Sequence, residues 1–247
     1  MDVALFVTCL TDTFFPRVGT AAVRILRHYG CRVHVPLAQT CCGQPAYNSG
    51  FHAEAAALVR RMIAIFEPYE RVVTPSASCA TMVKHHGPEL LAGDPAAHAA
   101  AGRLAEKTWE LTTFLRDELR VDLAAQLKFD EPVTFHYPCH ARETYTLADL
   151  HRCLCGQNGH DVRVPAHPDV CCGFGGAFAV EFPEVSAGML ADKLKELAAT
   201  GARLVICNEA ACALQMMGGA RRRGLPLRFR HLAECLAESL GLLEPSP

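Results

Sequence analysis

The chain has 247 residues, half of them apolar and a fifth charged, so it can bury a core and is not a disordered chain. Its 24 Lys and Arg residues against 26 Asp and Glu give a net charge of −2, which argues against a dedicated nucleic-acid binder. The 13 cysteines are the unusual feature, and because their number is odd they cannot all pair within one chain.

The N-terminal residues do not have the pattern of a targeting segment. Asp2 stands where a secretory signal carries positive charge, and the first apolar run stops at Thr11 and Asp12. No stretch approaches the ~18 uninterrupted apolar residues of a membrane span. We therefore expect a cytoplasmic protein whose thiols stay reduced, and metal or redox chemistry is favoured over a disulfide framework.

The first half of the chain predicts three short strands separated by helices. Strands are expected over residues 3–7, over a segment ending at Pro36 and over 71–74, and helices over 18–29 and 53–66. Each strand leads into a segment that carries cysteine, namely Cys9, then Cys41-Cys42-Gly43, then Cys79.

The second half repeats this order. Cys139 follows Cys9, and Cys171-Cys172-Gly173 follows the first triplet, both at an offset of 130 residues. Strands are expected over 133–136, up to Pro165 and over 203–206, and helices over 147–158 and 184–199. Because a shuffled chain would contain Cys-Cys-Gly only about 0.05 times, two copies indicate an internal repeat. We predict two homologous cysteine-rich domains, residues 1–128 and 129–247.

Alternating strands and helices predict an α/β fold with two pseudo-symmetric βαβ-type halves, each built on a small parallel sheet. In such sheets, binding residues gather in the loops beyond the carboxyl ends of the strands. The repeated cysteines follow the strands, so we expect them to form a cluster at that edge of each sheet.

The repeat gives four candidate thiolate ligands per half: Cys9, Cys41, Cys42 and Cys79, then Cys139, Cys171, Cys172 and Cys212. Four thiolates suit either a [4Fe–4S] cluster or a structural zinc ion. Adjacent cysteines reach one small ion with difficulty, whereas a cluster accepts ligands at different irons. The pattern therefore favours two [4Fe–4S] clusters, with zinc and metal-free thiols as the alternatives.

The last ligand of the second half has a competitor, Cys207. The repeat alignment places Cys79 opposite position 211, one residue short of Cys212, and it places Cys207 opposite Pro75 within the third strand. We therefore choose Cys212 and keep Cys207 as the alternative.

Other cysteines and histidines are assigned supporting roles. Cysteines in helical contexts are expected to pack rather than to bind metal: Cys31, Cys153, Cys155 and Cys235. His136 and His140 flank Cys139, and we expect them to pack against or support the site, with a histidine ligand as the alternative.

The lone cysteine, the Cys-Cys-Gly triplet and the further cysteine, present twice, resemble the cysteine-rich CCG-domain family. That family includes subunits of heterodisulfide reductase, of glycolate oxidase and of lactate-utilisation systems. The resemblance covers essentially the whole chain and is strongest to the lactate-utilisation members, through residues 6–10, 41–50, 109–112, 171–176 and 231–234. It implies an iron–sulfur electron-transfer subunit of a complex that oxidises L-lactate to pyruvate beside other iron–sulfur subunits, and that reaches a membrane only through partners.

Two departures limit what the resemblance implies. Heterodisulfide reductase subunits end each motif in Cys-x-x-Cys, whereas Met82 and Gln215 stand at those last positions here, which leaves the five-thiolate cluster and disulfide reduction unsupported. Gly173–Gly176 is not a dinucleotide fingerprint, so a hydride acceptor is expected on a partner. The alternatives are a subunit of a related glycolate oxidase or heterodisulfide-reductase-like enzyme, a thiol–disulfide enzyme, and a zinc-stabilised scaffold.

Overall fold

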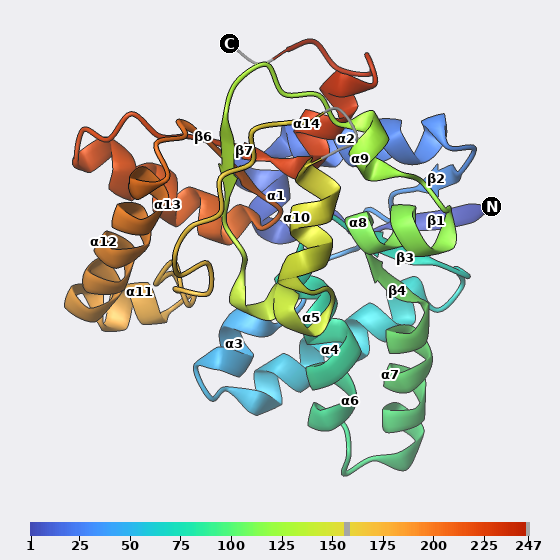
Figure 1. Cartoon of the computed structure of the whole chain (residues 1–247). Coiled ribbons are helices and arrows are strands. Elements are labelled where there is room, and N and C mark those ends of the chain that lie inside the picture. The colour runs from blue at the N-terminus through green and yellow to red at the C-terminus, as the bar shows by residue number, and fades with distance from the viewer. Residues whose placement is uncertain (156–158, 246–247) are drawn as a thin grey trace.

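The computed structural model describes residues 1–155 and 159–245, and within them it has two small parallel sheets (Figure 1). The first sheet has the order β2-β1-β3-β4, with β1 (Asp2–Leu5), β2 (Arg32–His34), β3 (Val72–Thr74) and β4 (Thr108–Glu110). The second has the order β5-β6-β7, with β5 (Val133–Phe135), β6 (Leu204–Cys207) and β7 (Arg228–His231). Every strand pair is parallel, which confirms the predicted α/β fold with two similar halves.

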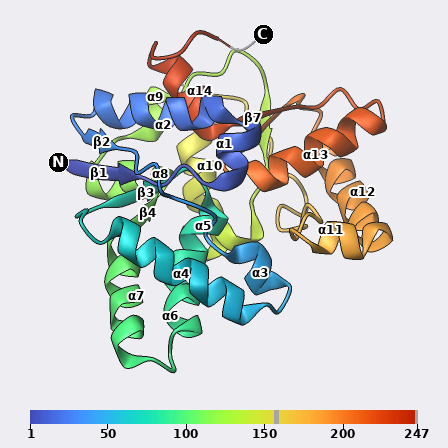
Figure 2. The same cartoon turned by 180° about the vertical axis from the view of Figure 1, so that it is seen from behind.

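Helices connect and cover the strands (Figures 1 and 2). Those of the first half are α1 (Cys9–Phe14), α2 (Pro16–His28), α3 (Gln44–Asn48), α4 (His52–Phe66), α5 (Ala77–Thr81), the π-helix η1 (Met82–His86), α6 (Gly87–Leu90), α7 (Pro95–Lys107), α8 (Leu111–Thr113), the π-helix η2 (Phe114–Glu118) and α9 (Leu123–Gln126). Those of the second half are the 3-10 helix η3 (Cys139–Glu143), α10 (Leu147–Cys155), α11 (Phe178–Glu181), α12 (Pro183–Ala199), α13 (Ala210–Arg222) and α14 (Leu232–Ser239).

The predicted elements correspond to β1, α2, β2, α4 and β3, and then to β5, α10, α12 and β6, with small shifts at their ends. The strand expected before Pro165 is reduced to one bridge between Val133 and Val162. Residues 156–158 of the helix expected over 147–158 lie outside the described residues. Strands β4 and β7 were not predicted, and they add one strand to each half of the repeat.

Successive side chains of the strands point to opposite faces of the sheets and so enter different cores. Val3 and Leu5 of β1 share one core with Val133 and Phe135 of β5, so this core spans both halves. On the other face of the first sheet, Phe6 and its neighbours pack on α4 and α7 in a second core. A third core lies between β6 and helices α12 and α13.

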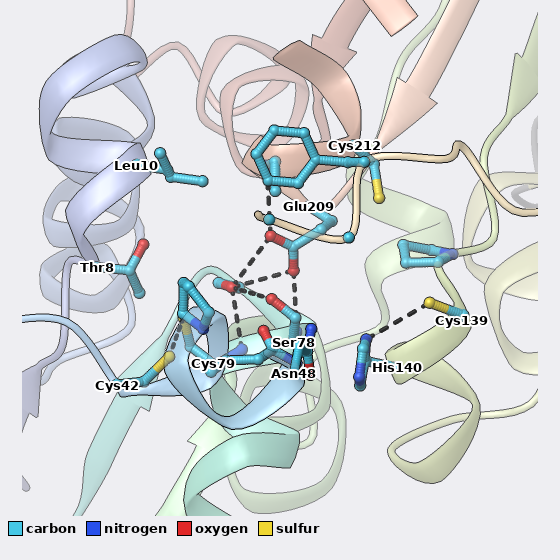
Figure 3. A pocket seen from close by; sticks show the side chains of 18 of the residues that line it. Thr8, Leu10, Cys42, Asn48, Ser78, Cys79, Cys139, His140, Glu209 and Cys212 are labelled. Atoms are coloured by element: carbon cyan, nitrogen blue, oxygen red, sulfur yellow. Dashed lines mark hydrogen bonds between the residues drawn. The ribbon is translucent and has the colours of Figure 1, made fainter. Parts of the chain in front are cut away.

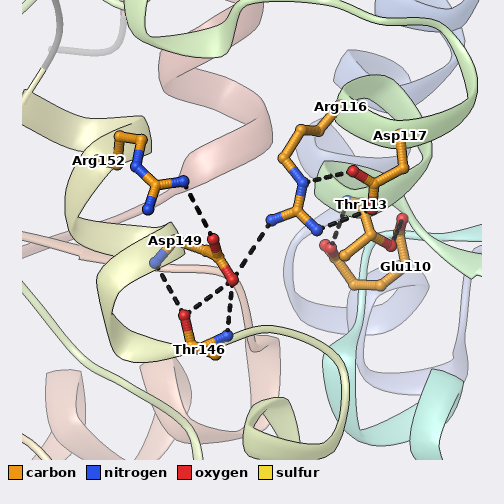
Figure 4. A network of polar contacts seen from close by, with 7 residues as sticks. All are labelled: Glu110, Thr113, Arg116, Asp117, Thr146, Asp149 and Arg152. Carbon is orange, nitrogen blue, oxygen red and sulfur yellow. Dashed lines mark hydrogen bonds and ion pairs between the residues drawn. The ribbon is translucent and has the colours of Figure 1, made fainter.

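Two further contacts join the halves. Helix α14 packs against α2, and Arg17 of α2 makes ion pairs with Glu234 at 3.3 Å and Glu238 at 2.8 Å. Arg116 lies 3.7 Å from a carboxylate oxygen of Asp149 in α10 (Figure 4). The shared core and these polar contacts fix the relative placement of the two sheets. Within residues 1–155 and 159–245, none of the helices combines the length and apolar character that crossing a bilayer requires.

Candidate metal centre

The carboxyl ends of the two sheets face one cavity of about 130 Å³. Its lining includes all eight cysteines predicted as ligands: Cys9, Cys41, Cys42, Cys79, Cys139, Cys171, Cys172 and Cys212. Figure 3 shows Cys42 and Cys79 on one side of Glu209 and Cys139 and Cys212 on the other. The sequence led us to expect a cluster at each sheet edge, and the structure brings the two sets to a common cavity. We refer to them as the first set, from residues 9–79, and the second set, from residues 139–212.

The first set is assembled from three segments. Cys9 begins α1, which follows β1 after a short loop, Cys41 and Cys42 lie in the loop before α3, and Cys79 lies in α5. The Sγ atoms of Cys42 and Cys79 are 3.3 Å apart, and the N–H of Gly43 donates to Cys41 Sγ at 3.5 Å. Backbone donors of this kind stabilise a thiolate and tune a bound metal centre.

The second set reproduces this geometry. The Sγ atoms of Cys172 and Cys212 are 3.0 Å apart, and the N–H of Gly173 donates to Cys171 Sγ at 3.4 Å. Cys139 begins η3 just after β5, as Cys9 begins α1 after β1. The repeat in the sequence is therefore also a repeat of the site.

The glycine of each Cys-Cys-Gly triplet is needed for two reasons, because its backbone has a positive φ and because a side chain at its position would have too little space. Gly43 and Gly173 have φ values of +94° and +78°, a region that other residues rarely adopt. A Cβ on Gly43 would lie 3.3 Å from the Ala55 carbonyl oxygen, and one on Gly173 would lie 2.6 Å from that of Ser186. The triplet loop thus lies directly on α4 in the first half and on α12 in the second, which holds the cysteine pair in place.

Backbone hydrogen bonds between strands define the correspondence of the halves more precisely than the sequence does. The N–H of Phe6 donates to the Val73 carbonyl at 2.8 Å, and the N–H of His136 donates to the Ile206 carbonyl at 2.9 Å. Val73 and Ile206 therefore correspond, and the same offset places Cys79 opposite Cys212.

Cys207 is placed differently from the eight. It ends β6 and is buried beneath the site, where its S–H donates to the Glu209 carbonyl at 3.2 Å and its Sγ accepts from the Glu209 N–H at 3.4 Å. It does not line the cavity. This placement supports Cys212 over Cys207, although the ligand role of both residues stays a prediction.

The thiols of each set act on one another. The thiols of Cys42 and Cys9 donate toward Cys41 and hold its pKa well below the usual value, and Cys139 and Cys172 do the same for Cys171. The pKa values of Cys9 and Cys139 are raised, because each hydrogen bonds to the more acidic partner. All thirteen cysteines are free thiols. Each set therefore stabilises one thiolate before any metal binds, and thiolates are the form that binds metal.

The side chain of Glu209, in the second half, hydrogen bonds to residues of the first half at the wall of the cavity. It caps the N-terminus of α13, and its carboxylate accepts hydrogen bonds from the Ser78 N–H at 2.9 Å and from Ser76 Oγ at 3.0 Å. Ser76 caps α5 in the same way, with Oγ accepting from the Cys79 N–H. Sequence reasoning missed this contact, and the signal available was a cap-forming residue three positions before the last cysteine of each set.

His136 and Lys193 are buried beside the second set. The ring of His136 is 1% exposed, and neither nitrogen has a hydrogen-bond partner among the described residues. Burial lowers its pKa to about 3, so the imidazole is neutral. Lys193 of α12 is fully buried, and its Nζ donates to the Pro168 carbonyl at 3.0 Å. We expected a supporting role for His136, and Lys193 was not singled out from the sequence.

The remaining cysteines and His140 lie as follows. Cys31 and Cys235 are buried in the core that spans both halves, and Cys153 packs against it. Cys155 lies 3.2 Å from a ring nitrogen of His151 in the same helix. His140 lines the cavity, with Nδ1 3.4 Å from Cys139 Sγ.

The chemistry of the donors tests what the cavity can hold. Each set offers four soft sulfur donors and a backbone N–H directed at one of them, which is the donor set of iron–sulfur clusters and of structural zinc. Cys172, Cys212 and His136 have candidate ligand atoms within 4.8 Å of one another. The residues therefore fit a metal ion or cluster.

Comparison with known proteins is consistent with this donor set. The model of the cysteine-rich domain family, CCG, matches residues 3–84 and 133–217, which contain the two sets. The chain is 42% identical over 243 residues to lactate utilization protein A of an Exiguobacterium species, covering 97% of this chain and 98% of that protein. It is 40% identical over 242 residues to lactate utilization protein A 2 of Bacillus cereus, covering 97% of this chain and 99% of the relative.

The fold is also similar to a solved structure. A hypothetical protein from Helicobacter pylori superposes with a TM-score of 0.65 at 12% identity. The match covers 97% of this chain and 49% of the other, so the chain spans about half the length of that protein. At this identity the similarity concerns the fold alone.

Proposed function

Because the chain belongs to the cysteine-rich CCG domain family, and its relatives over nearly the full length are lactate utilization proteins, we propose that it is an iron–sulfur electron-transfer subunit for the oxidation of L-lactate to pyruvate. The observation that carries this proposal is the convergence of eight free thiols from two repeats on one cavity. Bound iron–sulfur clusters would supply one-electron acceptance and release at that place.

Each half contributes its own ligands. Cys9, Cys41, Cys42 and Cys79 would hold one [4Fe–4S] cluster, and Cys139, Cys171, Cys172 and Cys212 the other. The N–H groups of Gly43 and Gly173 already donate to Cys41 and Cys171, and would stabilise negative charge on those sulfurs. Two cysteines of each set are buried in an apolar core, which keeps water from their sulfur atoms: Cys42 and Cys79, and Cys172 and Cys212.

The shared cavity gives the two sets a short connection. Both sets line the same cavity, and the hydrogen bonds of Glu209 to Ser76 and Ser78 join the two halves at its wall. An electron accepted at one set can therefore pass to the other within this chain. The hydride of lactate is expected to be accepted on a partner, and we propose other iron–sulfur subunits of a lactate-oxidising complex as the partners.

Metal analysis after anaerobic purification tests the proposal. We expect about eight irons and a matching amount of sulfide per chain, with the visible absorption of iron–sulfur clusters. Replacing the buried Cys42 or Cys172 with alanine should each remove about half of the iron. Cys31→Ala is the matched control, because Cys31 is buried in the core away from the cavity. Stoichiometric zinc without iron, or iron content unchanged by Cys42→Ala and Cys172→Ala, would overturn the proposal.

The lactate specificity has its own test. Variants that lose iron at either set should fail to restore growth on lactate in a strain that lacks the gene, whereas Cys31→Ala should restore it. Growth on glycolate, measured in parallel, distinguishes a lactate-oxidising system from a glycolate-oxidising relative.

A further inference from the structure

The two cysteine sets correspond residue by residue, but the side chain beneath them differs. Phe6 and His136 each follow the first strand of their half, and each donates its backbone N–H to the corresponding position of the neighbouring strand. Phe6 is fully buried in the same apolar core as Cys42 and Cys79, and its ring packs edge-on against Phe66 with centroids 5.5 Å apart. An imidazole therefore stands in the second half where the first half has a phenyl ring.

At a second pair of equivalent positions, the second half again has a nitrogen-bearing side chain where the first half has an apolar one. Ala55 and Ser186 occupy equivalent places, since each carbonyl is the nearest neighbour of its triplet glycine. The same offset along the two helices matches Met62 of α4 with Lys193 of α12. Met62 is 1% exposed and Lys193 is 0% exposed. The second half thus carries two buried nitrogen-bearing side chains where the first carries two apolar ones.

The histidine is oriented toward the cysteines. One of its ring nitrogens, the Sγ of Cys172 and the Sγ of Cys212 all lie within 4.8 Å of one another. Neither ring nitrogen makes a hydrogen bond within the described residues, although the ring is buried. Burial of an unpartnered imidazole costs free energy, and most buried polar groups have a partner. A metal centre held by the second set would supply that partner.

We propose that His136 is a nitrogen ligand of the metal centre held by the second cysteine set, so that this centre has mixed sulfur and nitrogen ligands while the first set binds through sulfur alone. The inference rests on the proposed iron–sulfur function. Each iron of a [4Fe–4S] cluster takes one terminal ligand, so His136 would take the place of one of the four thiolates of the second set. Replacing a thiolate with a neutral imidazole removes negative charge from the centre, and imidazole ligation raises the reduction potential of iron–sulfur centres. Lys193 is buried next to the core that holds Cys172 and Cys212, and its positive charge would stabilise the additional electron of a reduced centre. The centre held by the second set would therefore be the more easily reduced of the two.

Nitrogen coordination can be read directly in the unmodified protein. Anaerobically purified protein, labelled with ¹⁵N in histidine alone, would be reduced and examined by pulsed electron paramagnetic resonance. We expect the strong hyperfine coupling of a directly bound nitrogen at one of two centres. His136→Phe, which copies Phe6 of the first half, should abolish this coupling. His98→Gln, a change of an exposed histidine in α7, is the control and should retain it.

Iron analysis of the same samples separates the inference from the proposed function. A protein without iron and sulfide overturns both. A protein with the expected iron but with no nitrogen coupling, or only the weak coupling of a hydrogen-bonded nitrogen, overturns the ligand role of His136 and leaves the proposed function standing.

A redox titration tests the order in which the two centres are reduced. The wild type should be reduced in two separate steps, and Lys193→Met, which copies Met62, should move only the step at higher potential toward lower potential. Two centres that titrate together in the wild type, or a Lys193→Met variant with both steps unmoved, contradict the greater ease of reduction of the second set.

Discussion

Glu209 and Ser78 are 131 residues apart in the sequence, and the Glu209 carboxylate accepts the Ser78 N–H at 2.9 Å between the two cysteine sets. The carboxylate also accepts from Ser76 Oγ, so one buried side chain of the second half satisfies two donors at the N-terminus of a helix in the first half. That helix, α5, carries Cys79, and α13 on the other side carries Cys212. The contact therefore fixes the last cysteines of both sets relative to each other.

Removing this carboxylate should destabilise the fold. Glu209→Ala leaves the Ser78 N–H and the Ser76 hydroxyl without their partner, and each unsatisfied buried group costs about 1–3 kcal/mol. We expect the free energy of unfolding, measured by denaturant titration, to fall by that order, and by less in Glu209→Gln, whose amide oxygen can still accept. Glu106→Ala on the exposed face of α7 is the control. Equal losses in Glu209→Ala and Glu106→Ala would contradict the bridging role.

The choice between Cys212 and Cys207 can be made by iron content. Cys212 lines the cavity, whereas Cys207 hydrogen bonds to the backbone of Glu209 below it. Cys212→Ala should lose about half of the iron, while Cys207→Ala should keep all of it and lose only stability. Iron retained in Cys212→Ala but lost in Cys207→Ala would reverse the assignment.

The buried carboxyl of Glu110 predicts a pH dependence of stability. Burial raises its pKa from 4.5 to about 7, although Thr112 and Thr113 donate hydrogen bonds to it. Between these values the folded chain holds a proton that the unfolded chain releases, so this contribution to stability is complete below pH 4.5 and falls as pH rises through about 7. The loss amounts to about 3 kcal/mol by linkage.

Glu110→Gln isolates this effect, because the amide does not titrate. As pH increases from 5 to 8, the free energy of unfolding of the wild type should fall relative to that of the variant. The charged and titratable neighbours that act on Glu110 are Arg116, Tyr145 and Cys153, and the variant leaves them unchanged. A difference that is constant with pH would show that Glu110 titrates normally.

Gly173 and Gly188 form a matched pair for the packing of the second triplet on α12. Gly173 has φ +78° and its added Cβ would lie 2.6 Å from the Ser186 carbonyl, whereas a Cβ on Gly188 meets nothing within 4 Å. Gly173→Ala should destabilise by more than about 1 kcal/mol. Gly188→Ala, within α12, should stabilise by roughly 0.5–1 kcal/mol, since alanine has the higher helix propensity. Thermal unfolding of both variants checks the contrast.

The sequence predicted the elements that depend on local pattern. Apolar runs located β1, β3, β5 and β6, and the repeated cysteines marked the loops after them. Strands β4 and β7 were missed because residues 108–110 and 228–231 mix polar and apolar side chains without an apolar run. Of the strand expected before Pro165, only the pairing with Val133 is present, through backbone hydrogen bonds of Val133 with Asp161 and Arg163.

The arrangement of the site was less accessible from the sequence. The offset between the halves grows along the chain, from 130 residues at the triplets to 133 at the last cysteines, so the alignment used for Cys79 was one residue out. The common cavity depends on how the two sheets pack through the core of Val3, Leu5, Val133 and Phe135, a long-range contact that no local pattern encodes. That His136 has no hydrogen-bond partner among the residues that the structure describes likewise becomes visible only once the strands are packed.

The core that spans both halves makes the repeat equivalent to a dimer whose subunits are permanently tethered. Two separate copies would associate according to their concentration, whereas a covalent link holds the second copy at an effective concentration in the millimolar range. Each copy can also be altered without altering the other, which a symmetric dimer of identical chains does not allow. Two pairs of equivalent positions differ in this way: Phe6 in the first half corresponds to His136 in the second, and Met62 corresponds to Lys193. These differences make the surroundings of the two cysteine sets unequal in a protein whose halves are otherwise alike.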